Sequence, residues 1–317
     1  MPSYDAVLVV GFGGPEKHED VLPFLENVTR GRGVPRERLL GVAGHYYHFD
    51  GKSPINEQVR ALVAALQAVL PIPVYWGNRN WHPLLADSVR QMKADGIRRA
   101  VAIATSAFSS YSACRQYLEN IVEARTAVGE GAPVIDKIPP YWHHPGFLAA
   151  MADRVLAGVG EAGADGAVEL IFTAHSVPLS MASTSRYEGE LREAGRTIAG
   201  LAGVERWSLV WQSRSGPPTQ PWLEPDINDY LRARPDPAQP VVIAPVGFLS
   251  DHIEVLWDLD NEARATCEEL GTPMARAGTV GTHPTFIAAL RELALSPFEP
   301  CAEGCCPRPP RPVAPPR

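Results

Sequence analysis

The chain has 317 residues, of which 45% are hydrophobic and 21% charged, as is ordinary for a globular protein. This length can bury a large core and predicts two lobes. The formal net charge of -7 argues against nucleic acid as the main partner. No apolar run is long enough for a transmembrane helix, and the N-terminus lacks the features of a signal peptide. We therefore expect a cytoplasmic protein with reduced thiols and no stable membrane insertion.

Apolar runs alternate with amphipathic helical patterns along most of the chain. This alternation is typical of mostly parallel sheets with helices on both faces. One helical pattern begins at Ser53-Pro54, because serine is a good N-cap and proline suits the first helical position. The runs predicted to form strands are 6–10, 73–76, 100–104, 168–172, 208–211 and 241–246.

The two halves of the chain repeat each other weakly. In each half a predicted strand is followed by a polar segment, 77–83 in the first half and 212–216 in the second. A helix and another strand come after each of these segments. We expect an α/β fold with two similar Rossmann-like lobes whose parallel sheets face a central cleft, where ligands bind beyond the carboxyl ends of the strands. The predicted parts are an N-terminal lobe (1–140), a C-terminal lobe (141–283), a C-terminal helix and cysteine cluster that pack on the first lobe (284–306) and a disordered Pro/Arg tail (307–317).

A glycine-rich turn, Gly11-Phe12-Gly13-Gly14, follows the first predicted strand. It falls short of the dinucleotide fingerprint, and Pro15 fits that motif poorly, so nucleotide binding is disfavoured. Small residues at this turn would also let the backbone lie close to a flat ligand.

His175 follows the predicted strand 168–172. A lone histidine is usually structural, but an imidazole at a strand end can bind a divalent metal or accept a proton near neutral pH. A serine hydrolase is disfavoured, because the motif Gly-x-Ser-x-Gly is absent around Ser176.

Three acids, Glu254, Asp258 and Glu262, recur every four residues after the run 241–246. On a helix they share one face, where like charges repel. A solvated helix face is the ordinary explanation of such a pattern. Here the buried strand upstream and the histidine pair His175 and His252 favour a path for a cation or for protons.

Five motifs follow one another along the chain. They are Val10-Gly11-Phe12-Gly13-Gly14-Pro15, His45-Tyr46 with Gly51-Lys52-Ser53-Pro54-Ile55, Thr173-Ala174-His175-Ser176-Val177-Pro178, Trp211-Gln212-Ser213-Arg214-Ser215-Gly216 and Pro245-Val246-Gly247-Phe248-Leu249-Ser250-Asp251-His252-Ile253-Glu254. In order and spacing these motifs resemble those of the ferrochelatases. The resemblance covers nearly the whole chain to about Leu295, and the cysteine-rich tail resembles the iron–sulfur forms of actinobacteria and their relatives. It implies a fold like that of the class II chelatases.

The resemblance implies catalytic roles for the histidine and the acids. His175 would face the centre of the porphyrin ring as metal ligand or proton acceptor, and Glu254 would be its partner across the pocket, so both would contact the Fe2+ substrate. Asp258 and Glu262 would continue an acidic relay for metal delivery or proton exit. Ionised neighbours should raise the pKa of some of these acids.

The resemblance also implies a set of porphyrin-binding residues. Tyr46, Ser53 and Tyr117 match positions that contact propionates in the coproporphyrin-using branch. Arg30 would supply positive charge nearby, together with Arg32, although an ordinary basic loop is an equal alternative.

Two positions depart from the family pattern. Phe12 stands where several relatives have a tyrosine, and it would pack on the macrocycle without binding metal. His45 replaces a common arginine, which leaves one propionate contact open.

Three of the five cysteines, Cys301, Cys305 and Cys306, crowd the C-terminal segment, which in a reducing compartment suggests a metal or iron–sulfur centre. The resemblance implies that Cys114 completes the four thiolates of a [2Fe–2S] cluster. The adjacent pair Cys305-Cys306 is an unusual spacing. Zinc at the same four cysteines is the alternative, and Cys267 is predicted to be a buried thiol on a helix.

We therefore predict a lyase-type metal chelatase that inserts Fe2+ into coproporphyrin III to give coproheme in haem biosynthesis. The segment 45–55 is polar and lacks an apolar lip, which suits a substrate with four propionates. The alternatives are a protoporphyrin IX ferrochelatase, a cobalt chelatase for another tetrapyrrole and a non-catalytic haem-binding chaperone, which would not need the acidic relay. Neighbouring enzymes of the haem pathway are candidate partners, and the sequence leaves open a monomer or a homodimer.

Overall fold

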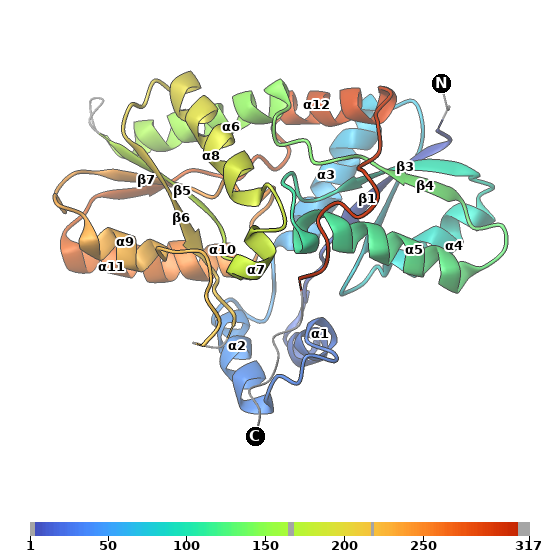
Figure 1. Cartoon of the computed structure of the whole chain (residues 1–317), viewed down its shortest axis with the longest axis horizontal. Coiled ribbons are helices and arrows are strands. Elements are labelled where there is room, and N and C mark those ends of the chain that lie inside the picture. The colour runs from blue at the N-terminus through green and yellow to red at the C-terminus, as the bar shows by residue number, and fades with distance from the viewer. Residues whose placement is uncertain (1–3, 164–167, 217–218, 310–317) are drawn as a thin grey trace.

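The computed structural model describes residues 4–163, 168–216 and 219–309. Two four-stranded parallel sheets lie in the two halves of the chain (Figure 1). The first has the strand order β2-β1-β3-β4 and the second the order β6-β5-β7-β8, so the two sheets share one topology. This arrangement confirms the predicted α/β fold with two similar Rossmann-like lobes, and the shared topology explains the weak repeat in the sequence.

The strands match the predicted apolar runs, with two additions. Both additions, β4 and β8, are short edge strands that leave little pattern in the sequence. β7 ends before Pro245, because proline has no N–H to donate to the ladder. The strands are β1 (Ala6–Gly11), β2 (Val74–Asn78), β3 (Arg99–Ala104), β4 (Val134–Lys137), β5 (Glu169–His175), β6 (Trp207–Gln212), β7 (Val241–Ala244) and β8 (Met274–Arg276).

Helices flank both sheets, and two segments are π-helical, a geometry that is often found at functional sites. Both π-helical segments, η2 (Tyr111–Arg115) and η3 (Leu256–Ala263), carry residues of the predicted sites. The other helices are η1 (His18–Asp20), α1 (Val21–Val28), α2 (Arg36–His48), α3 (Ile55–Val69), α4 (Leu85–Ala94), α5 (Gln116–Val128), α6 (Pro145–Glu161), α7 (Leu179–Ala182), α8 (Tyr187–Leu201), α9 (Ile227–Ala233), α10 (Ile253–Val255), α11 (Arg264–Leu270) and α12 (Pro284–Leu295).

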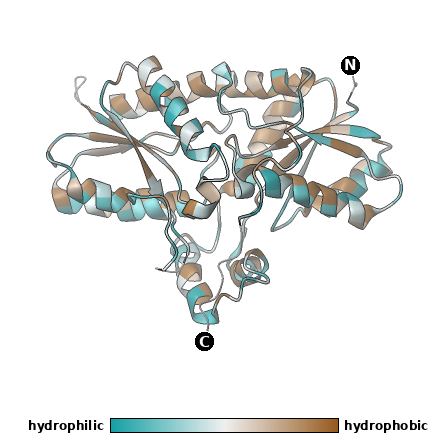
Figure 2. Ribbon diagram, viewed as in Figure 1, coloured by the Kyte–Doolittle hydropathy of each residue, from teal (hydrophilic) through white to brown (hydrophobic). Residues whose placement is uncertain are grey.

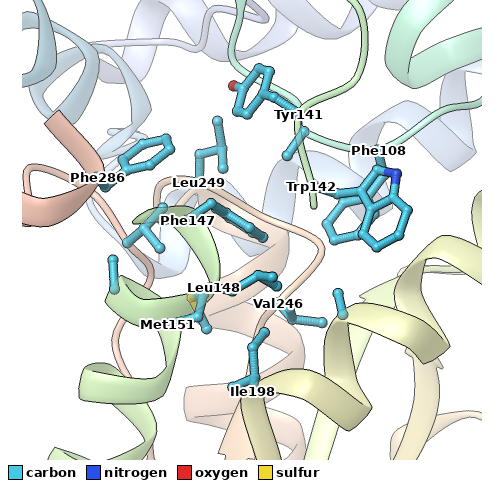
Figure 3. Close-up of a cluster of buried hydrophobic side chains, with 14 of the residues drawn as sticks. Phe108, Tyr141, Trp142, Phe147, Leu148, Met151, Ile198, Val246, Leu249 and Phe286 are labelled. Atoms are coloured by element: carbon cyan, nitrogen blue, oxygen red, sulfur yellow. The ribbon is translucent and has the colours of Figure 1, made fainter. Parts of the chain in front are cut away.

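One hydrophobic core runs through both lobes. It includes Val9 of β1, Leu170 of β5 and Phe286 of α12, all of which are inaccessible to solvent. Phe147 and Phe286 meet edge to face within this core (Figure 3). α12 packs against α6 and also against α3 of the first lobe. The strands are mostly apolar and the outer helices carry mixed faces, as expected for sheets covered on both sides (Figure 2).

α1 and α2 form a separate hairpin beneath the junction of the two lobes (Figure 1). The hairpin has its own small core, which includes Phe24 of α1 and Leu39 of α2. It also contacts the second lobe, because the guanidinium of Arg38 donates to the carbonyl of Ser215. The hairpin therefore comes from the first half of the sequence and also contacts the second lobe.

The start of α3 differs from the prediction. The expected N-cap role of Ser53 is wrong, because the helix begins at Ile55 with Pro54 at the cap and no side-chain capping bond. Ser53 instead donates its backbone N–H to the carbonyl of Pro15 at 2.8 Å.

The C-terminal segment reaches the first lobe. Within the tail predicted to be disordered (307–317), Arg308 donates hydrogen bonds to Tyr111 and Glu119. Residues 310–317 of that tail lie outside the described part of the chain.

Candidate active site

His175 is the last residue of β5, at the carboxyl edge of the second sheet. Its Nδ1 lies within hydrogen-bond distance of the carbonyl oxygen of Ser176. A carbonyl can only accept, so Nδ1 carries a hydrogen, and in the neutral imidazole Nε2 then has a free lone pair. Nε2 is 3.7 Å from Oε2 of Glu254. This separation suits two ligands of one divalent metal, because two ligand bonds of about 2.1 Å span up to about 4 Å.

Both side chains of this pair are open to solvent, with 32% of His175 and 48% of Glu254 exposed. Their approach depends on Gly247, in the turn that follows β7. A Cβ at Gly247 would lie 2.6 Å from the Cβ of Ala174, so only glycine lets the turn lie against the end of β5. The turn then leads to Glu254 on α10.

The acidic row predicted from the sequence runs along α10 and η3. Asp258, its central member, accepts hydrogen bonds from Gln212 Nε2 at 3.2 Å and from the Ser213 hydroxyl. Burial raises the pKa of Asp258 to about 8; Glu254 and Glu262 add in the same direction, and the hydrogen bonds oppose it. Asp258 is therefore mostly protonated at neutral pH.

The indole of Trp257 holds the outer end of the row and connects it to the first lobe. Its Nε1 donates to Glu262 Oε1 at 2.9 Å. The ring of His45, on α2, stacks on this indole with the centroids 4.1 Å apart and the planes at 7°. Burial lowers the pKa of His45, while Glu262 and Glu254 act in the opposite direction. The α1–α2 hairpin thus meets the acidic row from the opposite lobe.

Burial and the charge of Glu254 both affect the pKa of two half-buried neighbours, Tyr46 and His252. Burial raises the pKa of the Tyr46 phenol, and the charge of Glu254 adds to this effect. Burial also lowers the pKa of His252, whose ring meets Phe248 edge to face at 4.9 Å. Both groups are uncharged near neutral pH. Tyr46, predicted as a propionate contact, therefore lies within the electrostatic reach of Glu254.

The remaining predicted porphyrin-binding residues come from the first lobe. Phe12 and Tyr117 both face the guanidinium of Arg79, whose carbon lies 5.6 Å and 4.5 Å from their ring centroids. Tyr117 and Ser53 are buried, and Arg30 is exposed with no side-chain partner among the described residues. The structure thus brings Phe12 and Tyr117 together through Arg79, and neither Ser53 nor Arg30 joins this contact.

Arg79 is a site candidate that the sequence reasoning missed. It follows β2 directly, in one of the two polar segments that carry the internal repeat. Its Nε donates to Asn120 Oδ1 at 2.7 Å, which holds the guanidinium near the two rings. Its position in the sequence could have indicated this role, because Arg79 is a cation at the carboxyl end of a parallel strand, where such sheets bind ligands.

The cysteines that are distant in sequence meet beside the first lobe. Cys114 lies in η2, where the Ser110 hydroxyl caps the segment by accepting a backbone N–H at 2.9 Å. Cys301 interacts electrostatically with both Cys114 and Cys305. The sulfurs of Cys305 and Cys306 are 3.5 Å apart.

Burial raises the pKa of the Cys114 thiol, and the charge of Lys137 partly opposes this effect. Burial also raises the pKa of the Cys306 thiol to about 12, and the neighbouring Cys305 adds to the increase. In the part of the chain that is described, no group of three or more His, Cys, Asp and Glu side chains is arranged to hold a metal ion. Cys267, predicted to be a buried helical thiol, is buried in α11.

A cavity of about 620 Å³ lies at the cysteines and not at His175. We nevertheless place the candidate active site at His175 and Glu254, because they offer a free imidazole nitrogen and a carboxylate at ligand distance. The lining residues of the cavity include Ser109, Trp142, Arg186, Glu190, Cys305 and Cys306.

Comparison with known proteins shows the family of the chain. The model of the family described as Ferrochelatase matches residues 4–297. A ferrochelatase of Rhodopirellula baltica is 55% identical, over 90% of this chain and 84% of its own length. A coproporphyrin III ferrochelatase of Streptomyces coelicolor is 48% identical, over 98% of this chain and 96% of its own length. Another of that name, from Mycobacterium avium, is 50% identical, over 92% of this chain and 87% of its own length.

Similar solved structures support the fold alone, since their sequence identity is low. CbiX, described as the terminal enzyme for biosynthesis of sirohaem in denitrifying bacteria, has a TM-score of 0.55 at 16% identity and covers 92% of this chain and 100% of its own. SirB from Bacillus subtilis has a TM-score of 0.55 at 14% identity and covers 92% of this chain and 96% of its own.

Among the described residues, no helix has the length and apolar character needed to cross a membrane. The family model and the relatives of high identity both extend over nearly the whole chain. From this extent and identity it follows that the chain is a metal chelatase and belongs to the ferrochelatase family.

Proposed function

We propose that this chain inserts Fe2+ into coproporphyrin III and so forms coproheme for haem biosynthesis. The observation that carries the proposal is the free Nε2 of His175, 3.7 Å from the carboxylate of Glu254, at the edge of a chelatase fold. The relatives from Streptomyces coelicolor and Mycobacterium avium, which are named coproporphyrin III ferrochelatases, support the choice of substrate.

The reaction exchanges two N–H protons of the porphyrin for one Fe2+. His175 Nε2 and Glu254 are suited to hold the ion at the ring, because imidazole and carboxylate both bind ferrous iron. The protons released need acceptors within reach of the ring. Asp258, which follows Glu254 in the acidic row and has a pKa of about 8, exchanges protons near neutral pH.

A substrate with four carboxylates needs cationic partners, and the first lobe offers them. Arg79 lies close to Phe12 and Tyr117, and Arg30 and Arg32 are exposed between α1 and α2. We expect Arg79→Ala to raise KM for the porphyrin about tenfold or more with little change in KM for Fe2+, since a hydrogen bond to a charged group contributes about 1.5–3 kcal/mol. An unchanged porphyrin KM would remove Arg79 from the substrate site.

Steady-state iron insertion into coproporphyrin III and into protoporphyrin IX tests the substrate. A higher kcat/KM for coproporphyrin III supports the proposal, and an equal or higher value for protoporphyrin IX overturns it. Cobalt insertion is measured in the same assay by exchanging the metal.

Two variants test the site. His175→Ala and Glu254→Gln should each lower kcat by about 10²-fold or more, the range for a missing acid or base. Unimpaired insertion in both variants would refute the site assignment. Porphyrin binding without turnover in the unmodified protein would favour the haem chaperone.

We also propose that Cys114, Cys301, Cys305 and Cys306 hold a [2Fe–2S] cluster. The donor type and number suit such a cluster, and Cys301 lies within electrostatic reach of both Cys114 and Cys305, but the four thiols are not gathered into one metal-holding group in the described chain. When bound, such a cluster would supply one-electron chemistry and tie the C-terminal segment to η2. Iron, sulfide and zinc analysis after anaerobic purification decides the matter. Iron and sulfide in equal amounts support the cluster, while zinc without sulfide supports the alternative.

The cytoplasmic location, the four predicted parts of the chain and the oligomeric state stay predictions from the sequence. Neighbouring enzymes of the haem pathway stay candidate partners.

A further inference from the structure

The cavity of about 620 Å³ next to the cysteines has no part in the chemistry of the acidic row. Its wall combines segments from distant parts of the chain. Trp142 comes from the connection before α6, Thr184 and Ser185 from the connection before α8, and the pair Cys305 and Cys306 from the segment after α12. Small molecules therefore have a path to these two sulfurs.

The backbone turns both sulfurs toward the same space. Neighbouring side chains of an extended chain point to opposite faces. Cys306 departs from this rule, because its φ is +51°, in the left-handed region that residues other than glycine seldom occupy. The Sγ–Sγ separation from Cys305 is 3.5 Å, and both residues line the cavity.

Cys306 shares the cavity with a buried carboxylate that two hydrogen bonds hold in place. Glu190 of α8 is only 5% exposed, and its carboxylate accepts from the backbone N and the hydroxyl of Ser109, both at 2.7 Å. Glu190 lines the cavity together with Cys306, which is 7% exposed, while Cys305 is the more accessible member of the pair. Among the described residues no disulfide joins any of the five cysteines, so a new S–S bond between Cys305 and Cys306 would displace no existing one.

We propose that Cys305 and Cys306 form a redox-responsive dithiol that a small hydroperoxide, entering through the cavity, converts to a vicinal disulfide. In the first step the sulfur of Cys305 attacks the peroxide, the O–O bond breaks, and one water leaves as Cys305 becomes a sulfenic acid. In the second step the thiol of Cys306 gives up its proton as its sulfur attacks that of Cys305, the S–O bond breaks, and the leaving hydroxide takes this proton and departs as a second water. Two thiols and one hydrogen peroxide thus give one disulfide and two waters, with two electrons passed to the peroxide.

The oxidation needs a small movement and gives a labile bond. A disulfide is about 2.05 Å long, so the sulfurs approach by about 1.5 Å from their present separation of 3.5 Å. The Cα atoms of neighbouring residues are about 3.8 Å apart across a trans peptide, below the usual range of about 4.4–6.8 Å for disulfides. Such a bond is strained and readily reduced by thiols, as regulatory disulfides are.

Oxidation of the pair and metal binding exclude each other, because sulfurs joined in a disulfide are no longer thiolate ligands. This consequence rests on the cluster proposed above, while the disulfide itself does not. In the oxidised state two of the four predicted ligands are lost, and Cys114 and Cys301 alone cannot complete a cluster. The pair would therefore make cluster assembly dependent on the peroxide level.

The test uses the full-length metal-free protein, purified under reducing conditions and treated with stoichiometric hydrogen peroxide. We expect an intact-mass loss of two hydrogens, two fewer thiols that react with iodoacetamide, and fragment spectra that assign the link to Cys305 and Cys306. Dithiothreitol should reverse all three changes. Cys305→Ser and Cys306→Ser should each abolish the mass loss, and Cys267→Ser, which changes a buried cysteine in α11, should not.

Access is tested with a variant that fills the cavity. Thr184→Trp should slow the oxidation severalfold, whereas Thr197→Trp, at an exposed position of α8, should not. The proposal is overturned if the link maps to Cys114 and Cys301, or if the mass loss persists in Cys306→Ser. Failure of the cluster proposal is seen separately, as absence of iron and sulfide in the anaerobic protein. Cluster reconstitution that succeeds equally in oxidised and reduced protein would refute the mutual exclusion.

Discussion

Replacing Asp258 with asparagine should remove a specific dependence of stability on pH. Burial raises the pKa of this acid from 3.8 to about 8. The native state therefore binds the proton more tightly than the unfolded state does. Between these two pKa values the unfolded chain has lost the proton and the native protein keeps it, so the free energy of unfolding falls as pH rises.

The size of the effect follows from the shift. The slope is about 1.4 kcal/mol per pH unit inside the window, and the whole effect reaches at most about 6 kcal/mol above pH 8. Asparagine has no proton to lose there, and its side-chain oxygen still accepts from Gln212 and Ser213. Asp258→Asn should therefore become more stable relative to the unmodified protein as pH rises from 5 to 8, and its kcat should fall, since an amide cannot exchange protons.

The assay is urea denaturation at unit steps from pH 5 to pH 9, with Asp229→Asn, at an exposed position of α9, as the control. The control should keep the pH dependence of the unmodified protein. If Asp258→Asn and the unmodified protein show the same slope between pH 5 and pH 8, Asp258 does not hold a proton in that range, and its proposed role in proton exchange fails as well.

Two further substitutions test how neighbouring segments are held together. Glu190→Ala leaves the two donors of Ser109 without their buried acceptor, which should lower the free energy of unfolding in urea by about 3 kcal/mol. The control Glu193→Ala, at an exposed position of the same helix, should change it by about 0.5 kcal/mol or less. Gly247→Ala places a Cβ 2.6 Å from that of Ala174 and should cost about 1–3 kcal/mol while also lowering kcat; unchanged stability would mean that the turn is free to shift.

The sequence was most informative where the chemistry follows the chain locally. The alternation of apolar runs and helical patterns predicts the parallel sheets, because a buried parallel strand reads as a continuous apolar run. The terminal position of His175 on its strand follows from the same run. The four-residue spacing of the acids is also local, and the structure shows Asp258 within electrostatic reach of both Glu254 and Glu262.

Features that depend on contacts between distant segments could not be predicted in this way. The four-residue spacing of the acids does not distinguish the π-helix η3 from an α-helix, because an α-helix fits the same spacing. The contact between Arg79 and Tyr117 joins residues that follow two different strands. The stacking of His45 on Trp257 joins the two lobes, and no pattern within either segment indicates it.

The sequence left open whether the acidic row carries iron in or protons out, and the environment of Asp258 favours protons. A carboxyl group with a pKa of about 8 is mostly protonated at neutral pH, and a protonated carboxyl is a poor ligand for Fe2+. The same group is well suited to exchange protons, because its pKa lies near the working pH. Glu262 is hydrogen-bonded to Trp257, so it is held at the outer end of the row. Iron would then reach His175 and Glu254 from their exposed side, and the row behind them would return the porphyrin protons to solvent.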